Sequence, residues 1–332
     1  MEVGYAVLYA DGTLVISKNH TILSKKMEFD YGKFEDTLVP WGKDYNKIEK
    51  VQIFDQVKSN CMREWFKMCN YLTTLIDFKN LDVSDCVDFS YLFAYCNSLQ
   101  NIDELKNLNV SNSRRFIGMF SHCKMLQNID ALKDWNVSNC LAFMEMFEGT
   151  NIHSISALEN WNVSTAENFA YMFFDCELLE NINGVTNWNV SNVTNLTGMF
   201  FDCMSLENID GVTNWNVSNC KNFSHVFNNC ISLENIDPLQ NWKVSNGLKF
   251  SYMFDNCTSL KNTDALKNWD VSNGEEFCYM FSYCESLQII SLPNTLTHLI
   301  FSLFLNCNPT LKFDWKNHIY TCADLYEYQT IS

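Results

Sequence analysis

The sequence is poor in the residues that interrupt regular structure. Its 332 residues include four prolines and eleven glycines, and no Pro-, Gly- or Ser-rich stretch divides it into independent domains. It also lacks the run of about 20 apolar residues needed to span a bilayer, and its opening residues, MEVGYAVLYA, do not resemble a signal peptide. We therefore expect one continuous, soluble architecture without membrane insertion. The predicted location is cytoplasmic, with the cell surface or secretion as the alternative if an export signal has been removed.

Positive charge is also scarce in this chain. It has 23 Lys and Arg residues against 39 Asp and Glu residues, which gives a formal net charge of −16. Repulsion from phosphate groups makes nucleic acid an unsuitable partner and disfavours anionic membrane surfaces. The acidity does not by itself indicate a basic ligand, because a negative surface also keeps a protein soluble.

What the sequence does contain is a repeat. A Met-Phe, Leu-Phe or Val-Phe pair marks it, and the marker phenylalanines are 27 residues apart except for one step of 26. Residues 196–219, LTGMFFDCMSLENIDGVTNWNVSN, are a representative copy. A period of this length predicts a solenoid, in which each unit buries its apolar face against its neighbours. The marker residues are Phe93, Phe120, Phe147, Phe173, Phe200, Phe227, Phe254 and Phe281, and Phe66 extends the series.

Each unit combines two patterns of apolar residues. Phe116, Met119, Phe120 and Cys123 have the i, i+3, i+4, i+7 spacing of one helix face. The following LQNID or LENID segment is too short for a helix and suits a short parallel strand. The fold class predicted is therefore an α/β solenoid with a short helix and a short parallel strand per turn.

The ends of the chain differ from the repeats. Residues 3–18 carry two apolar runs around Asp11-Gly12, which predicts a hairpin, and IEKVQIF (48–54) predicts another strand. We expect a β-rich N-terminal cap at 1–58, the solenoid at 59–308 and a C-terminal cap at 309–332. The fourth repeat is one residue short and has Thr150 near the usual cysteine position, so a local distortion is expected there.

Nine of the fifteen cysteines occupy one repeat position. Metal sites need local pairs such as C-x₂-C, and disulfides need pairs that converge, so a single column of cysteines predicts buried free thiols and favours a reducing compartment. No phosphate-binding loop or nucleophile–base pair occurs, and the six histidines are scattered. We therefore expect no metal, no cofactor and no enzymatic activity. The nine cysteines are Cys69, Cys96, Cys123, Cys176, Cys203, Cys230, Cys257, Cys284 and Cys307.

Three further columns have a structural and a functional interpretation. Tryptophans recur from Trp135 to Trp269, at a position where earlier turns have leucine, which favours packing over stacking with a glycan. The Asn-Val-Ser tripeptides match the glycosylation motif, but their fixed repeat position favours side-chain bonds to turn backbone. The Asn and Asp residues of NID could bind cations, and a hydrogen-bonded polar ladder is the favoured interpretation.

The NWNVSN and MF-x-x-C-x-S-L blocks resemble the BspA-type leucine-rich repeats of bacterial surface proteins over about residues 60–308. The segments DGTLVIS, VPW (39–41) and KVQIF are similar to the region that often precedes such repeats. The resemblance implies a non-catalytic solenoid, often found in surface proteins that adhere to host proteins. We find neither an export signal nor an anchoring signal or immunoglobulin-like module in this sequence. We therefore expect the fold that the resemblance implies rather than the adhesive role.

Surface positions at which neighbouring repeats differ are the candidate binding sites. At the position after the marker phenylalanine, two neighbouring repeats carry a large apolar residue, Phe174 and Phe201. We expect these two rings to stack, with Tyr171 one turn before Phe174. We expect a non-catalytic scaffold that binds a protein partner through such positions. The alternative is a bacterial surface adhesin that binds host matrix proteins or glycans. A second aromatic cluster is formed by Tyr252, Tyr279 and Tyr283.

Overall fold

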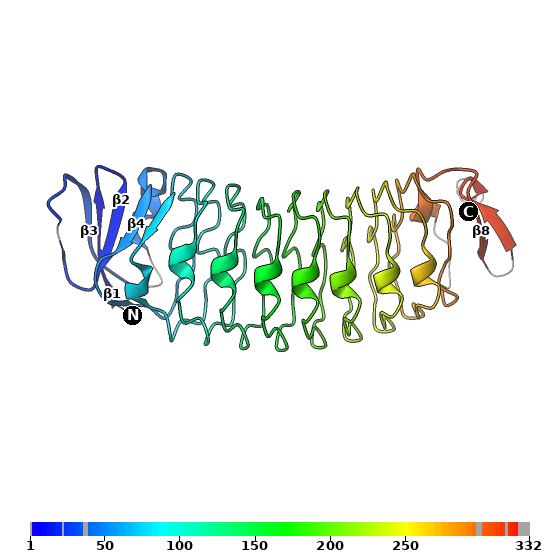
Figure 1. Cartoon of the computed structure of the whole chain (residues 1–332), viewed down its shortest axis with the longest axis horizontal. Helices are drawn as coiled ribbons and strands as arrows, with labels where there is room; N and C mark the ends of the chain where they lie inside the picture. Colours follow the sequence, from blue (N-terminus) through cyan, green and yellow to red (C-terminus); the bar gives the residue numbers. More distant parts are fainter. Residues whose placement is uncertain (1, 22, 36–38, 297–300, 316–317, 325–332) are drawn as a thin grey trace. The chain divides into compact units, whose positions relative to one another are not determined.

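The protein folds into two compact units, each built from stacked repeats (Figure 1). The computed structural model describes residues 2–21, 23–35, 39–296, 301–315 and 318–324. Unit 1 contains Met1–Ile152 and Asn160–Thr165, and unit 2 contains His153–Glu159 and Ala166–Ser332. The division falls in the repeat that is one residue short, inside the range 59–308 predicted as one solenoid.

A five-stranded sheet opens unit 1 (Figure 1). The hairpin predicted around Asp11-Gly12 is present, because β1 pairs antiparallel with β2 and Leu8 lies opposite Leu14. The predicted strand within 48–54 is β4, which pairs in parallel with β2 and with β6. The strand order is β3-β1-β2-β4-β6, with β1 (Glu2–Tyr9), β2 (Thr13–Ser17), β3 (Met27–Glu35), β4 (Lys50–Ile53) and β6 (Thr74–Ile76).

Short elements connect this sheet to the first repeats. Trp41 is buried against Phe34 and Trp65, and its indole Nε1 donates a 2.6 Å hydrogen bond to the Trp65 carbonyl. A buried indole with its N–H bonded adds apolar burial without leaving a polar group unsatisfied. The connecting elements are η1 (Pro40–Lys43), η2 (Tyr45–Lys47), β5 (Val57–Lys58), η3 (Phe78–Asn80) and β7 (Leu81–Asp82), and β5 pairs in parallel with β7.

The F-x-x-M-F-x-x-C segments do not form the predicted helix. In residues 116–123, Gly118 and His122 have φ values of 56° and 57°, so the backbone becomes left-handed at every fourth residue. An α-helix requires negative φ throughout, so the helix prediction is wrong, and two successive tight turns take its place. The burial deduced from the spacing is right. The fully buried side chains of this segment are Phe116, Met119, Phe120 and Cys123.

Bonding between neighbouring repeats explains why tight turns replace the helix. The N–H groups of Phe89, Tyr91, Phe93 and Tyr95 donate to carbonyls 26 residues further on, in the next repeat, at 2.7–3.0 Å. The N–H groups between them bond within the turn, as Leu92 does to the residue three positions before it. A helix would keep these donors inside the segment. The alternation instead joins these double turns of unit 1 to their neighbours within the unit, and unit 2 repeats it from residue 223 to 229.

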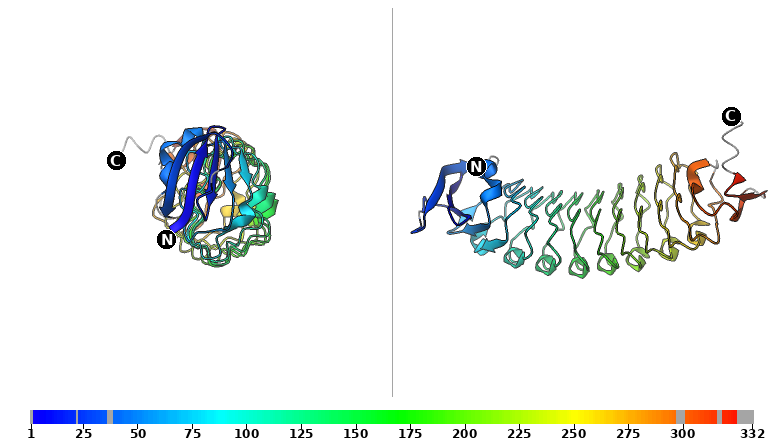
Figure 2. Two further views of the ribbon diagram at one scale, coloured as in Figure 1. Left: turned by 90° about the vertical axis from the view of Figure 1, so that its left-hand side faces the viewer. Right: turned by 90° about the horizontal axis from the view of Figure 1, so that it is seen from above.

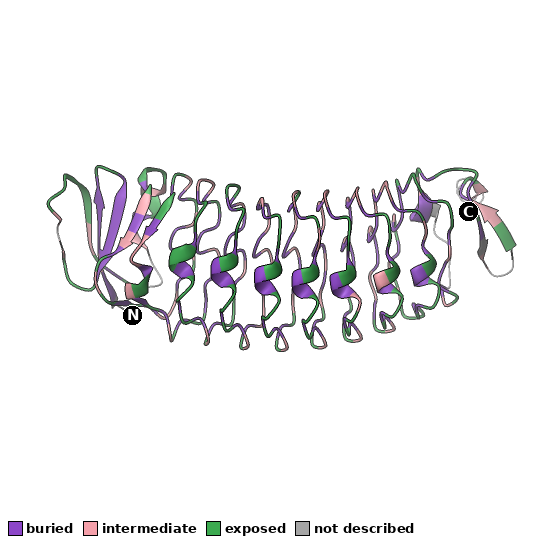
Figure 3. Cartoon of the chain, viewed as in Figure 1, coloured by how far each residue is buried: buried purple, intermediate pink, exposed green. Residues whose placement is uncertain are grey.

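The LENID segments do not form the predicted strand. Ile209 has φ −115° and ψ 25° and leads directly into a 3-10 turn. Neighbouring repeats meet here through single parallel bridges, as between Asn181 and Asn208. Within each unit the 3-10 turns form a row along one side (Figure 2), buried on one face and exposed on the other (Figure 3). They are η4 (Asp103–Leu105), η5 (Asp130–Leu132), η6 (Ser156–Leu158), η7 (Asn183–Val185), η8 (Asp210–Val212), η9 (Asp237–Leu239) and η10 (Asp264–Leu266).

The core of each unit consists of aromatic columns. Marker rings stack at 5.5–5.8 Å from Phe66 to Phe147 in unit 1, and at 5.4–5.8 Å from Phe173 to Phe304 in unit 2. The tryptophan column is buried as well, and each indole N–H donates to a carbonyl of the preceding repeat, as Trp215 does to Val185 at 3.0 Å. The alternative interpretation, in which a glycan stacks on these tryptophans, is therefore wrong.

The cysteine column is buried as predicted, and none of the fifteen cysteines, which all lie among the described residues, forms a disulfide. The Sγ atom of Cys230 donates to the carbonyl of the marker Phe200 in the preceding repeat, 3.2 Å away, and Cys257 bonds Phe227 in the same way at 3.1 Å. A small side chain with a weak donor suits this position, since it fills a narrow column and satisfies a buried carbonyl.

The C-terminal part of unit 2 departs from the repeat. The turn η11 (Phe301–Phe304) precedes a two-stranded hairpin of β8 (Lys312–Trp315) and β9 (His318–Thr321). The predicted C-terminal cap at 309–332 extends beyond this hairpin, and its residues 316–317 and 325–332 lie outside the described residues. Within the described part of the chain, no helix is long and apolar enough to cross a membrane.

Candidate functional site

Three positions of each double turn carry the side chains that vary between repeats. They lie two residues before the marker phenylalanine, one residue after it and two residues after it. In the first double turn of unit 2 these are Tyr171, Phe174 and Asp175, which are all partly exposed. Tyr171 and Asp175 have left-handed φ values of 58° and 59°. Because the double turns stack in register, each position forms a column along the unit.

The first two columns of unit 2 hold an unbroken stack of aromatic rings, which we call the aromatic ladder. The Tyr171 ring meets Phe174 edge-on at 5.9 Å, and Phe174 stacks on Phe201 at 4.8 Å. The stack then crosses from one column to the other, and every later ring pair lies within 5.7 Å. All its side chains are partly exposed. The ladder consists of Tyr171, Phe174, Phe201, His225, Tyr252 and Tyr279.

The structure joins the two clusters that the sequence suggests, and His225 connects them. Its ring stacks between Phe201 at 5.7 Å and Tyr252 at 4.7 Å. Sequence reasoning missed this residue because the histidines were considered for catalysis rather than by repeat position. Its place two residues before Phe227, equivalent to Tyr252, was the available signal. Tyr283 lies in the third column, is 45% exposed, and is not part of the ladder.

A glycine explains how the ladder begins. Gly198 occupies the first column at φ +58°, and a Cβ atom there would lie 2.4 Å from the Tyr171 ring. Tyr171 therefore lies against the backbone of the next repeat, in space that any larger residue would take. The absence of a side chain at Gly198 also leaves Phe201 in the second column as the next ring of the stack.

Acidic and amide side chains flank the ladder in the third column. The carboxylate of Asp202 accepts a hydrogen bond from Asn229 Nδ2, and Asn229 in turn accepts one from Asn256. Burial raises the pKa of Asp202; the bond from Asn229 opposes this rise, and the charges of Asp175 and Glu177 add to it. The carboxylates here are thus partly removed from water and repel one another.

Further along the ladder the polar residues lie in the second column. Burial raises the pKa of Asp255, although its Oδ1 accepts a 2.7 Å hydrogen bond from Ser282 Oγ, which acts in the opposite direction. His225 Nδ1 lies 2.9 Å from Asn228 Nδ2, so this nitrogen accepts and Nε2 carries the proton. Burial lowers the pKa of His225, which keeps the imidazole neutral at pH 7. The ladder therefore carries no positive charge of its own at that pH.

The other polar columns have structural partners. Asn208 Oδ1 accepts the backbone N–H of Asp210 at 2.6 Å while its Nδ2 donates to the carboxylate, and Asn216 of the Asn-Val-Ser tripeptide accepts the N–H of Ser218. These are bonds of an Asx turn. No group of three or more His, Cys, Asp or Glu side chains suited to a metal ion occurs among the residues that the structure describes.

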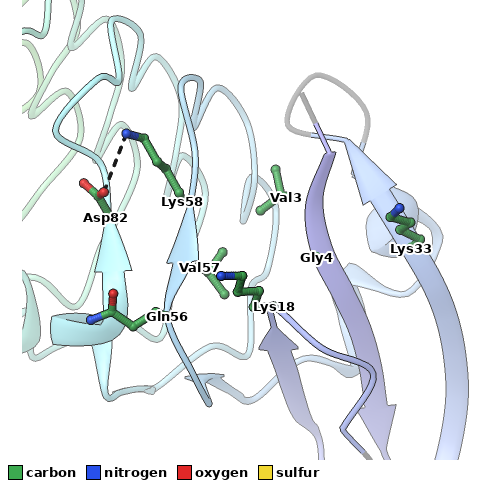
Figure 4. Close-up of a pocket in the computed structure, with 8 residues that line it drawn as sticks. All are labelled: Val3, Gly4, Lys18, Lys33, Gln56, Val57, Lys58 and Asp82. Carbon is green, nitrogen blue, oxygen red and sulfur yellow. Dashed lines mark ion pairs between the residues drawn. The ribbon is translucent and has the colours of Figure 1, made fainter.

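A pocket of about 380 Å³ lies in unit 1 beside the N-terminal sheet (Figure 4). Lys18, Lys33 and Lys58 line it together with Asp82. The Lys58 ammonium lies 3.8 Å from Asp82 and 2.6 Å from Asp85, so the chain itself neutralises this cation. The aromatic ladder therefore remains the stronger candidate for a binding surface.

Comparisons with solved structures find bacterial leucine-rich-repeat proteins at low similarity. A leucine-rich cell surface protein of Faecalibacterium prausnitzii is 16% identical, with 88% of this chain and 94% of that chain covered and a TM-score of 0.35. A leucine-rich-repeat protein of Eubacterium ventriosum is 14% identical, with 95% and 96% covered and a TM-score of 0.38. One of Bacteroides ovatus is also 14% identical, with 89% and 76% covered and a TM-score of 0.33.

Comparisons of the sequence with protein families are more informative. No curated protein matches the chain. Residues 276–326 match the BspA type leucine rich repeat region, which confirms the resemblance to BspA-type repeats in that part of the chain. Residues 60–182 and 177–292, together well over half of the sequence, match a second family. The chain belongs to the family described as Mycoplasma protein of unknown function, DUF285.

Proposed function

We propose that this protein is a non-catalytic scaffold that binds a protein partner through the aromatic ladder of unit 2. The observation that carries the proposal is the run of six partly exposed rings from Tyr171 to Tyr279, of which Tyr171 meets Phe174 edge-on and the other five are stacked. Contiguous apolar surface of this kind is typical of protein-binding sites, and aromatic residues dominate the binding energy at such sites. The buried columns alone would stabilise the repeats without exposing these rings.

Repeat variation supports the same proposal. At the position after the marker phenylalanine, other repeats carry small or polar residues such as Ala94, Ser121 and Ser282, which the fold therefore accepts. Phe174 and Phe201 are consequently not required to build a double turn. Large apolar side chains retained on two neighbouring repeats fit a contact surface better than a structural need.

A capture experiment with matched variants tests the proposal. The full-length wild-type chain and a Phe174→Ser/Phe201→Ser variant would be immobilised, cross-linked in lysate of the source cells, and compared by quantitative mass spectrometry. We expect a protein recovered by the wild type to be at least about tenfold depleted by the variant, since ring anchors contribute about 2 kcal/mol or more. Ala94→Ser, the same position in unit 1, is the control. Equal recovery by all three proteins would refute the proposal.

Adhesion at the bacterial surface is the second candidate function. The match of residues 276–326 to BspA-type repeats favours it, because the resemblance implies surface proteins that adhere to host proteins. The absence of disulfides among the fifteen cysteines favours the predicted cytoplasmic location over the cell surface, since reduced thiols persist in a reducing compartment. Saturable binding to purified extracellular matrix proteins, with no partner recovered from source-cell lysate, would support adhesion.

We further propose that the β-rich N-terminal segment caps the repeats of unit 1. The parallel pairing of β4 with β6 and the packing of Trp41 on Phe66 at 6.3 Å support this role. Trp41→Ala should lower the free energy of unfolding by about 3–5 kcal/mol, measured by urea titration. A change below about 1 kcal/mol would contradict a capping role for this contact.

A further inference from the structure

The carboxylates beside the aromatic ladder receive no cation from the described part of the chain. The ion pairs described in unit 2 join Lys249 to Glu276 and Lys261 to Glu234, outside the three columns. The columns themselves contain no lysine or arginine in unit 2. Among the described residues, the side-chain donors to Asp202 and Asp255 are neutral: the Asn229 amide and the Ser282 hydroxyl.

The equivalent position in unit 1 shows a different arrangement. Tyr91 lies two residues before its marker phenylalanine, as Tyr171 does, and the chain places two cations over its ring. The Arg63 guanidinium is 5.7 Å and the Lys67 ammonium 5.1 Å from the ring centroid. Glu64 Oε1 lies 3.3 Å from that ammonium and 3.5 Å from the guanidinium. Ring, cation and carboxylate thus meet in unit 1, whereas unit 2 supplies only the rings and the carboxylates.

Net charge separates the two units in the same direction. Unit 1 has 16 Lys and Arg residues against 20 acidic residues, whereas unit 2 has seven lysines, no arginine and 19 acidic residues. The net charges are therefore −4 and −12. A field concentrated on one unit raises the local concentration of cations and the rate at which a positively charged partner associates.

From these observations we propose that the partner bound by the aromatic ladder presents an extended segment rich in lysine or arginine; this inference rests on the proposed function. The aliphatic stems of these side chains lie across the ladder rings, and their cationic heads pair with Asp175, Asp202 and Asp255. Lysine and arginine combine an apolar stem with a charged end, so one side chain satisfies both kinds of surface.

The dimensions of the ladder set the length of the segment. From Phe174 to Tyr279 the ring centroids advance in four steps of 4.7 to 5.7 Å. The ladder from Phe174 to Tyr279 is therefore at most roughly 20 Å long, the span of about six residues of extended chain at 3.3 Å per residue. A ten-residue peptide covers it with residues to spare.

The raised pKa values of the flanking carboxyl groups agree with a cationic partner. Burial raises the pKa of both Asp202 and Asp255, so each carboxylate is less favourable in the folded protein than in water. Asparagine would occupy either position without that penalty. The third column, which holds Asp202, does contain Asn229 and Asn256, and the second column, which holds Asp255, contains Asn228. Aspartate is therefore better explained by an incoming cation than by the stability of the free protein.

A peptide titration tests the inference. A fluorescein-labelled ten-residue peptide of alternating lysine and serine would be titrated with the full-length protein and followed by anisotropy, beside the same peptide with glutamine for lysine. We expect the wild type to bind the lysine peptide at least about tenfold more tightly than the glutamine peptide. The Asp202→Asn/Asp255→Asn variant should bind the lysine peptide about tenfold more weakly than the wild type does. Glu180→Gln/Glu207→Gln, which removes two charges from unit 2 outside the three columns, should weaken binding less than about twofold.

Two results would overturn the inference. One is equal binding of the lysine and glutamine peptides, and the other is an equal loss in the ladder variant and the control, which would indicate attraction by net charge alone. Failure here is distinguishable from failure of the proposed function. If the capture experiment still loses its partner in Phe174→Ser/Phe201→Ser, the ladder binds a partner of other chemistry, and only the inference is wrong.

Discussion

Raising the pH above 9 should unfold this protein, because the folded repeats hold their thiols in the protonated form. Burial raises the pKa of Cys123 from its ordinary value of 9.0 to about 12, and Cys69, Cys86 and Cys140 of the same unit behave alike. A group whose folded pKa is raised gives stabilisation that is complete below its unfolded pKa. That stabilisation is lost as the pH climbs from 9 towards 12.

The expected loss is large because the thiols act together. By pH 10 each such thiol gives up roughly 1 to 2 kcal/mol of stability, since the unfolded chain ionises there and the folded chain does not. Four of them give up about 6 kcal/mol, which is comparable with the whole stability of a typical domain. We therefore expect an unfolding transition between about pH 9 and 10.5.

Urea titrations monitored by circular dichroism at several pH values between 7 and 10 would measure this loss. Cys123→Ala should make the decline in unfolding free energy above pH 9 less steep, because one proton fewer is released on unfolding. The matched control is Cys278→Ala, because the Cys278 side chain is exposed rather than buried. Stability that stays constant to pH 10, or an equal change of slope in both variants, would refute the reasoning.

Three further predictions concern the ladders. Phe200→Ala, in the fully buried marker column of unit 2, should lower the free energy of unfolding by about 3–5 kcal/mol in urea titrations, and a loss below about 1 kcal/mol would contradict the stacking. Gly198→Ala should lower it by at least about 1 kcal/mol, since the new Cβ meets the Tyr171 ring at a left-handed backbone position; an unchanged melting temperature would argue against that packing. Asp202→Asn should raise the melting temperature at pH 7, because the raised pKa makes the ionised carboxylate unfavourable in the folded state. The same variant should bind the lysine peptide more weakly, and a lower melting temperature would contradict the prediction.

Sequence reasoning recovered the period and the buried columns because both depend on spacing alone. Phe116, Met119, Phe120 and Cys123 are buried whether the segment is a helix or a pair of tight turns, since both bring residues three and four apart to one side. The helix itself could not be distinguished from the double turn within one repeat. The deciding contacts join residues 26 apart, as Tyr91 is joined to Ile117, and they exist only once the repeats stack.

The candidate surface was only partly predictable for a related reason. Phe174 and Phe201 could be paired from the sequence because they share one column on neighbouring repeats. The crossing to His225 depends on Gly198, whose missing side chain interrupts the first column and leaves Phe201 as the next ring. That crossing requires three-dimensional coordinates, so two separate clusters were expected where the structure has one ladder.

Aromatic carbon–proton NMR spectra of the full-length protein, recorded during titration with the lysine–serine peptide, test the central claim most directly. The account predicts that the resonances of the ladder rings, such as Phe201, His225 and Tyr252, shift progressively. The buried Trp215 and the marker Phe200, which lie outside the contact surface, should stay unchanged. Shifts confined to other residues, or no shift at saturating peptide, would contradict the assignment of binding to the aromatic ladder.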